Sequence, residues 1–308
     1  MLDMNAANGN DDGAGPAPAP PVGGVPGRPS GVVPRLKLAN PAQVEQGTLL
    51  KPRWGTWHAV IGLLLVIALP LAGTLVLVEV VPFGPALVFA SLLLTWTAML
   101  GTCLVASKKW GFGSLAKDFG LRFRWVDLVI GLGVGLAARV LLAVVLALLT
   151  ALWPLEEGEV IQGNAELFLT GDTVWLVLNA VLGGILIAPF LEELFNRGLV
   201  LRAVQNAWWL RSPRSRHRVS EAVPRRSLVT ATVISVLVSS LAFGLLHTGA
   251  VPDLRSSVYL LVGTFTVGLV CGLLTVWTGR LGPAIVTHVV FNGSAIGLLL
   301  IIPQELLQ

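Results

Sequence analysis

Seven long apolar stretches dominate the chain after Trp54 and constrain its fold more than any other feature. Each is close to the ~20 residues that a helix needs to cross a hydrocarbon core of about 30 Å. Backbone groups inside a bilayer need internal partners, and the stretches lack the alternation of barrel strands, so we expect helices. The predicted spans are residues 57–79, 84–107, 126–153, 173–203, 228–250, 256–278 and 281–303. The predicted fold class is therefore all-α, a polytopic transmembrane bundle of about seven spans.

Composition agrees with a membrane protein. The 308 residues are 54% hydrophobic and 12% charged, whereas soluble domains carry about a quarter charged residues. Nucleic-acid binding is not indicated. Cys103 and Cys271 lie within apolar runs, so we expect neither a disulfide framework nor a cysteine zinc site. Residues 1–53 lack aromatic residues and are rich in Pro, Gly and Ala, which predicts a disordered tail before a transmembrane domain at 54–308.

The charges of the connecting loops alternate along the chain. The third loop is acidic and has no base, and the first loop also lacks basic residues. Cytoplasmic loops are enriched in Lys and Arg, so the pattern predicts a cytoplasmic N-terminus and an external C-terminus. The basic residues lie in the tail (Arg28, Arg35, Lys37, Lys51, Arg53), in the second loop (Lys108, Lys109, Lys117, Arg122, Arg124) and in the fourth (Arg211, Arg214, Arg216, Arg218, Arg225, Arg226).

Four polar residues lie in the second half of the fourth stretch, Glu192, Glu193, Asn196 and Arg197. An ionised side chain at bilayer mid-depth costs about 2.5 to 3.5 kcal/mol, and such residues usually face a cavity. Helical residues four apart share a face, which pairs Glu193 with Arg197 and Glu192 with Asn196. Arg197 would then neutralise Glu193 and leave Glu192 available as a base. The alternative is a cytoplasmic helix end whose charges meet lipid headgroups.

Two further polar pairs have the same spacing, Phe243 with His247 and His288 with Asn292. Glutamate and histidine can activate water, while a second histidine and an amide can donate hydrogen bonds to an oxyanion. Alternatively, Glu192, His247 and His288 would form a three-ligand zinc site with water in the fourth position. Both metal-free and zinc-assisted hydrolysis remain open, so the cofactor is unassigned.

The polar motifs occur in the order of a known family. "EELFNR" fits EExxxR, "FGLLH" fits FxxxH and "HVVFN" fits HxxxN, and residues 120–303 thereby resemble the CPBP family (CAAX prenyl protease and bacteriocin-processing, also called ABI) of intramembrane proteases. The resemblance implies that Glu192 is the catalytic glutamate and that Glu193 and Arg197 support it. It implies that His247 assists water activation and that His288 and Asn292 stabilise the oxyanion. Phe243 and Asn196 would be supporting residues.

The resemblance also implies a substrate class. Eukaryotic members remove the last three residues of prenylated CAAX proteins, and bacterial relatives are linked to bacteriocin maturation or self-immunity. Family members are often labelled metalloproteases, although their metal dependence is disputed. The expected partners here are the lipid bilayer and a peptide or lipidated protein within it. A composition rich in Ala, Gly, Val and Arg suggests a GC-rich bacterium and hence its cell membrane.

Arg139 stands near the middle of the third stretch and belongs to none of the motifs. It could be a counter-charge to Glu192 or Glu193, or contact a substrate carboxylate, but an ion pair between helices is the favoured interpretation. Two GxxxG pairs predict close helix packing. These are Gly131 with Gly135 and Gly268 with Gly272.

The predicted function is an intramembrane endopeptidase that uses Glu192-activated water. One alternative is a non-hydrolytic self-immunity or transport protein with the same buried polar cluster. Another is a scaffold whose basic loop at 211–226 binds anionic lipid or a soluble partner. His58 and His217 are given no catalytic role. In straight vertical helices His247 would lie near the outer end of its span and His288 near the inner end, so the site requires tilted or broken helices.

Overall fold

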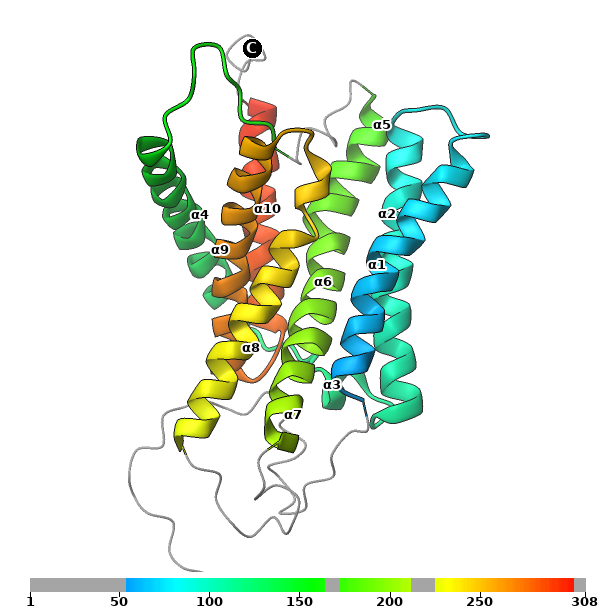
Figure 1. The fold of residues 1–308 in the computed structure, drawn as a ribbon, viewed down its shortest axis with the longest axis vertical. Helices are drawn as coiled ribbons and strands as arrows, with labels where there is room; N and C mark the ends of the chain where they lie inside the picture. The colour runs from blue at the N-terminus through cyan, green and yellow to red at the C-terminus, as the bar shows by residue number, and fades with distance from the viewer. Residues whose placement is uncertain (1–53, 164–171, 212–224, 302–308) are drawn as a thin grey trace, which may run out of the picture. The chain divides into compact units, whose positions relative to one another are not determined.

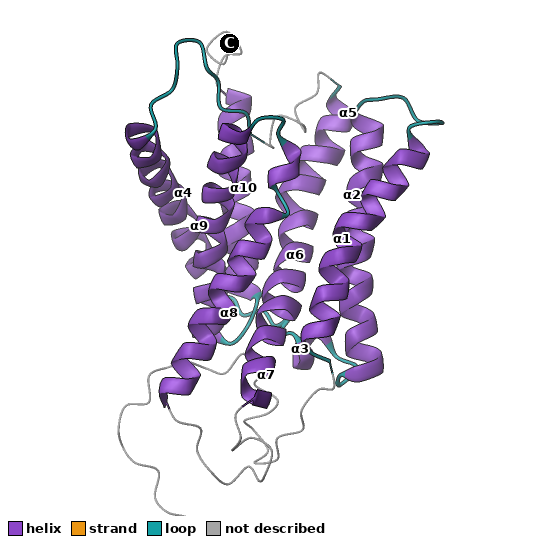
Figure 2. Cartoon of the chain, viewed as in Figure 1, coloured by secondary structure: helices purple, strands orange, loops and turns teal. Residues whose placement is uncertain are grey.

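The computed structural model describes residues 54–163, 172–211 and 225–301, and it contains helices but no strands in these ranges (Figures 1 and 2). The predicted all-α class is confirmed. The predictions for the tail, for part of the acidic third loop, for His217 and for most of the basic fourth loop fall outside the described residues. The main helices are α1 (Thr56–Leu77), α2 (Pro85–Val105), α3 (Leu115–Asp118), α4 (Val126–Leu152), α5 (Thr173–Leu176), α6 (Ala188–Glu193), α7 (Leu201–Arg211), α8 (Arg225–Leu245), α9 (Leu254–Thr278) and α10 (Gly282–Ile301).

Six helical segments in the described residues are long and apolar enough to cross a membrane. The fourth is continuous from Thr173 to Arg211 and includes α5, α6 and α7. The fifth predicted stretch, 228–250, contains only a shorter apolar helix, Val229–Leu245. Hydropathy placed its end five residues too late, because Gly249 and Pro252 follow and disfavour a continuing helix.

Glycines let the helices around α10 and α9 approach closely. A Cβ on Gly135 of α4 would lie 2.8 Å from Cβ of Val290 in α10. A Cβ on Gly268 would lie 3.1 Å from Cβ of Ser240 in α8, and one on Gly272 would lie 3.1 Å from Val236. Gly131 likewise packs against Val286. Both predicted GxxxG pairs therefore serve as packing faces, as expected where van der Waals contact drives helix association.

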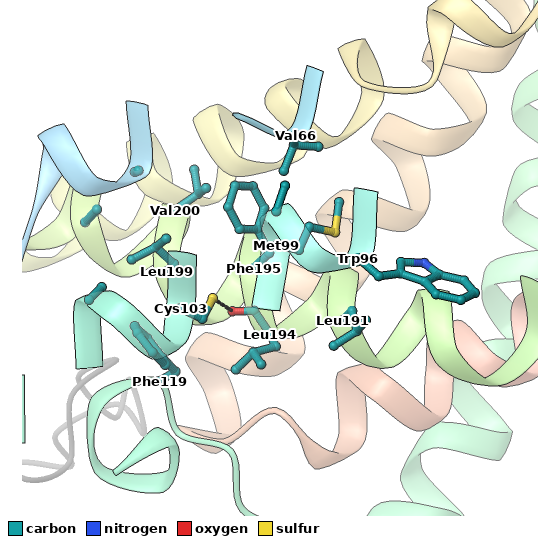
Figure 3. Close-up of a cluster of buried hydrophobic side chains, with 14 of the residues drawn as sticks. Val66, Trp96, Met99, Cys103, Phe119, Leu191, Leu194, Phe195, Leu199 and Val200 are labelled. Atoms are coloured by element: carbon teal, nitrogen blue, oxygen red, sulfur yellow. Dashed lines mark hydrogen bonds between the residues drawn. The ribbon is translucent and has the colours of Figure 1, made fainter. Parts of the chain in front are cut away.

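A cluster of buried apolar side chains holds the fourth span against α1 and α2 (Figure 3). Leu191, Leu194 and Phe195, which flank the two glutamates, are all buried in it. Cys103 of α2 is buried as a free thiol whose Sγ lies 3.9 Å from the carbonyl oxygen of Leu194. The glutamates are therefore carried by a segment that is fixed on one side by packing.

Polar contacts anchor the ends of the helices that lie beside the basic loops. The buried Asp127 carboxylate accepts hydrogen bonds from Arg280 Nε at 3.0 Å and from the Arg124 backbone at 2.9 Å. The backbone N–H of Leu281 donates to the carbonyl of Gly120 at 2.9 Å. These bonds join the beginning of α4 to the turn before α10 and fix where α10 begins.

Candidate active site

A cavity of about 610 Å³ lies between α2, α4, the fourth span, α8, α9 and α10. Its walls are mostly apolar. All three motifs contribute to it, and the predicted site residues that line it are Arg139, Glu192, Phe243, His247, His288 and Asn292. Glu193, Asn196 and Arg197 are fully buried and do not line it. The structure therefore gathers the motifs and separates them into a cavity layer and a layer behind it.

Glu193 is the centre of the layer behind the cavity. Its Oε1 lies 2.9 Å from Nη1 of Arg197, and both side chains are fully buried. This is the ion pair that the spacing of four residues predicts. The same oxygen lies 3.0 Å from Nδ1 of His288. Because a carboxylate only accepts hydrogen bonds, Nδ1 carries the hydrogen and the His288 ring is held in one orientation.

Glu192 points the other way. Its side chain is 15% exposed, and its Oε2 lies 3.7 Å from Nε2 of His288. The imidazole therefore stands between two consecutive glutamates, one buried and ion-paired, the other open to the cavity. This divergence follows from the ~100° rotation between neighbouring helical residues.

Phe243 links the two histidines. Its ring lies edge-on to His247 at 4.6 Å and to His288 at 5.5 Å, with the Arg197 guanidinium carbon 4.5 Å from its centroid. Nδ1 of His247 lies 2.8 Å from the Phe243 carbonyl oxygen. A carbonyl also only accepts, so Nδ1–H of His247 donates and Nε2 remains for other partners.

The expected separation of His247 and His288 in depth is wrong, because α8 ends at Leu245. Gly244 packs on Leu261, which lies about two turns inside the first residue of α9. Figure 1 shows α8 ending partway along α9 and α10. His247 therefore lies within the bundle rather than at its outer edge.

Asn292 fills a gap that Pro189 creates. The fourth span is π-helical at Val177–Ile187, where the N–H of Ala188 donates to the carbonyl of Gly183. The next donor in this pattern would be residue 189, but proline has no N–H, so the Gly184 carbonyl loses its partner. Nδ2 of Asn292 donates to this carbonyl at 2.9 Å. One N–H of the amide is thereby occupied, and the other remains for the cavity.

A second π-helical stretch, Leu194–Val200, follows the glutamates directly. Such stretches are rare and occur frequently at functional sites. Asn196 lies within it and donates to the backbone carbonyl of Glu192 at 3.0 Å, whereas the spacing had suggested a partner for the Glu192 side chain. The backbone carbonyl of Asn196 accepts a hydrogen bond from the Ser239 hydroxyl of α8 at 2.8 Å. Asn196 therefore supports the backbone beneath the glutamates.

Arg139 joins α4 to α10 without an acidic partner in the described part of the chain, so the favoured ion pair is wrong. Its Nε donates to Ser294 Oγ at 3.2 Å and its Nη2 to the Phe291 carbonyl. Its guanidinium carbon lies 3.9 Å from the centroid of the Phe291 ring. These hydrogen bonds and the contact with the Phe291 ring hold α4 against α10.

The three side chains of the alternative zinc site, Glu192, His247 and His288, all lie around the cavity. Among the described residues, no group of three His, Cys, Asp or Glu side chains lies close enough together to hold a metal ion. Glu192, His247 and His288 line the same cavity but do not form such a group. Whether the protein uses zinc therefore stays a prediction, to be checked by metal analysis.

Sequence reasoning missed two contributors to the cavity. Tyr259 lines it, and its hydroxyl shares a 2.9 Å hydrogen bond with Thr150. The sequence contains a single tyrosine, located in an apolar span, which was an available signal. Residues 161–163 of the acidic loop also line the cavity, and the Gln162 backbone donates to Ser256 at 2.9 Å. Nothing in the loop's composition distinguished them.

The comparisons with known proteins agree with the motifs. Residues 173–294 match the family model described as type II CAAX prenyl endopeptidase Rce1-like. No curated protein and no solved structure matches the chain. The family supports a CAAX-type intramembrane protease function, and together with the apolar helices it makes the chain an integral membrane protein. The chain therefore carries a type II CAAX prenyl endopeptidase Rce1-like domain, within the CPBP family that its motifs resemble.

Proposed function

We propose that the protein hydrolyses a peptide bond of a membrane-associated substrate with water activated by Glu192. The observation that carries the proposal is the position of His288, held by Glu193 on one side and facing Glu192 and the cavity on the other. One glutamate orients the imidazole and the other is free to accept a proton. Apolar walls exclude bulk water and thereby strengthen the electrostatic interactions inside.

The proposed reaction uses only these side chains. Glu192 takes a proton from water as the water oxygen attacks the substrate carbonyl carbon, and Nε2 of His247 orients that water. The resulting oxyanion receives hydrogen bonds from the free N–H of Asn292 and from Nε2–H of His288. His288 acts here in its doubly protonated form, because its Nδ1–H already donates to Glu193. Collapse of the intermediate breaks the C–N bond, and the proton on Glu192 passes to the leaving amine. Glu193 and Arg197 act through His288 and do not touch the substrate.

The test compares membranes that contain wild-type or Glu192→Gln protein, and searches by proteomics for new peptide termini. We expect Glu192→Gln to abolish cleavage while membrane insertion is unchanged, since the change is nearly isosteric. Glu157→Gln is the matched control, because Glu157 is exposed in the loop after α4. Turnover that persists in Glu192→Gln would refute the assignment.

The non-hydrolytic alternative makes an opposite prediction. Protection that survives both Glu192→Gln and His288→Ala would favour a non-hydrolytic self-immunity protein. The basic-loop scaffold is tested separately, by loss of partner recruitment when residues 211–226 are deleted. A bacterial cell membrane with a cytoplasmic N-terminus remains our proposal for location.

A further inference from the structure

Arg139 is the charged residue that the proposed reaction does not use. It lies thirteen residues from both Val126 and Leu152, at the centre of α4, and it lines the cavity. A cation at the centre of a membrane span costs about 2.5 to 3.5 kcal/mol on insertion scales, and such residues usually pair with another group or mark a pathway. No acidic side chain in the described ranges pairs with it.

The contacts of Arg139 fix its position but leave its charge uncompensated. Nε bonds Ser294, and one hydrogen of Nη2 bonds the Phe291 carbonyl. Both partners are neutral. Both hydrogens of Nη1 and the second hydrogen of Nη2 have no hydrogen-bond partner among the described residues. Two nitrogens of one guanidinium are the group that binds a carboxylate with two parallel hydrogen bonds.

We propose that Arg139 is the subsite for a carboxylate of the bound peptide, with the α-carboxylate of a free C-terminus as its source. The inference rests on the proposed hydrolysis and assigns a specificity-determining residue to it. The Phe291 ring against the guanidinium and the apolar cavity walls exclude water, which makes an ion pair there stronger than one at a surface.

The position on α10 sets the distance from the cleaved bond. The Phe291 carbonyl, to which Arg139 is tied, lies three residues beyond His288, or about 4.5 Å along the helix axis. An extended peptide spans ~3.3 to 3.6 Å per residue. On that scale the axial offset between His288 and the Phe291 carbonyl corresponds to about one residue of extended peptide, so the carboxylate subsite lies close to the cleaved bond. The released fragment would therefore be short.

The test measures binding and needs no turnover. Three lipidated peptides are bound to Glu192→Gln protein in nanodiscs. Two share one sequence and end in a free carboxylate or in a carboxamide, and the third is a carboxamide whose last residue is replaced by glutamate. We expect the free acid to bind about tenfold to a hundredfold more tightly than the plain carboxamide, as for a charge-assisted hydrogen bond. Adding Arg139→Gln should reduce this ratio to about one.

Two further variants separate charge recognition from helix joining. Arg139→Lys keeps the charge and should keep part of the preference. Ser294→Ala removes a hydrogen bond between α4 and α10 but leaves the guanidinium, so the preference should survive even if the protein is less stable. If Arg139 only joined the helices, Arg139→Gln would instead weaken the binding of all three peptides equally.

Each outcome decides the proposal. Equal binding of acid and carboxamide to Glu192→Gln protein, or a preference unchanged by Arg139→Gln, overturns it. If only the glutamate-ended carboxamide binds tightly, Arg139 still binds a carboxylate, but that carboxylate belongs to a side chain and not to the C-terminus, which overturns the proposed source. Failure of the wild-type protein to cleave any peptide refutes the hydrolase and leaves the binding ratios readable.

Discussion

Nδ1 of His288 lies 3.0 Å from Oε1 of Glu193, the same oxygen that lies 2.9 Å from Nη1 of Arg197. One buried carboxylate oxygen therefore orients an imidazole and neutralises a guanidinium. The other oxygen of Glu193 is buried and has no hydrogen-bond partner among the described residues. The orientation of the His288 ring thus depends on an ion pair that is inaccessible from the cavity.

Removing both members of this ion pair should be less damaging than the two single losses added together. Glu193→Gln leaves the Arg197 charge buried and unpaired, and breaking a buried pair costs about 3 to 5 kcal/mol. Arg197→Met likewise leaves the Glu193 carboxylate buried without its cationic partner, and we expect a similar loss of stability. We expect the double variant to lose less stability than the sum of the single ones, measured by thermal unfolding in detergent. Strictly additive losses would contradict coupling between the two side chains.

The hydrogen bond from Asn292 to Gly184 should depend on Pro189. Asn292→Leu leaves the Gly184 carbonyl unpaired inside the bundle, and interhelical hydrogen bonds in membranes contribute on the order of 0.6 to 1.7 kcal/mol. In a Pro189→Ala background the restored N–H can take that carbonyl, so Asn292→Leu should then cost less. Thermal unfolding of the four proteins checks this. A cost that is independent of residue 189 would show that proline does not create the vacancy.

The spacing of residues along the sequence was sufficient to predict side-chain contacts between residues of the same helix. The pairing of Glu193 with Arg197 and the divergence of Glu192 follow from helical geometry alone. The partners of Asn292 and Arg139 could not be predicted, because both are backbone carbonyls, at Gly184 and Phe291. Every residue has a carbonyl, so the sequence carries no signal for which one is free.

The depth of a residue within the membrane was predicted less well than the presence of the helices. Hydropathy counts apolar residues and does not detect where a helix ends, so the span 228–250 was drawn past Leu245 and His247 was placed too far out. The predicted span 126–153 agrees with α4 within a residue. Error in one helix end was enough to separate two histidines that share a cavity.

Metal dependence is predicted from the positions of the ligands. Since no three ligating side chains converge in the described ranges, we expect cleavage to persist after chelator treatment and purified protein to lack stoichiometric zinc. Elemental analysis of wild-type and His247→Asn protein, each before and after chelation, measures this. Zinc at one equivalent in the wild type, lost in His247→Asn, together with activity restored by added zinc, would contradict the expectation.

The contact between α4 and α10 should control both stability and the position of His288. Gly135→Ala places a Cβ 2.8 Å from Val290, two residues beyond His288, so α10 must shift away. Overpacking of this kind costs about 1 to 3 kcal/mol, and we expect lower thermal stability together with slower cleavage. Gly133→Ala is the matched control on the same helix, because a Cβ there meets no atom within 4 Å. Equal effects of the two substitutions would mean that helix propensity, rather than the packing of α4 on α10, determines the outcome.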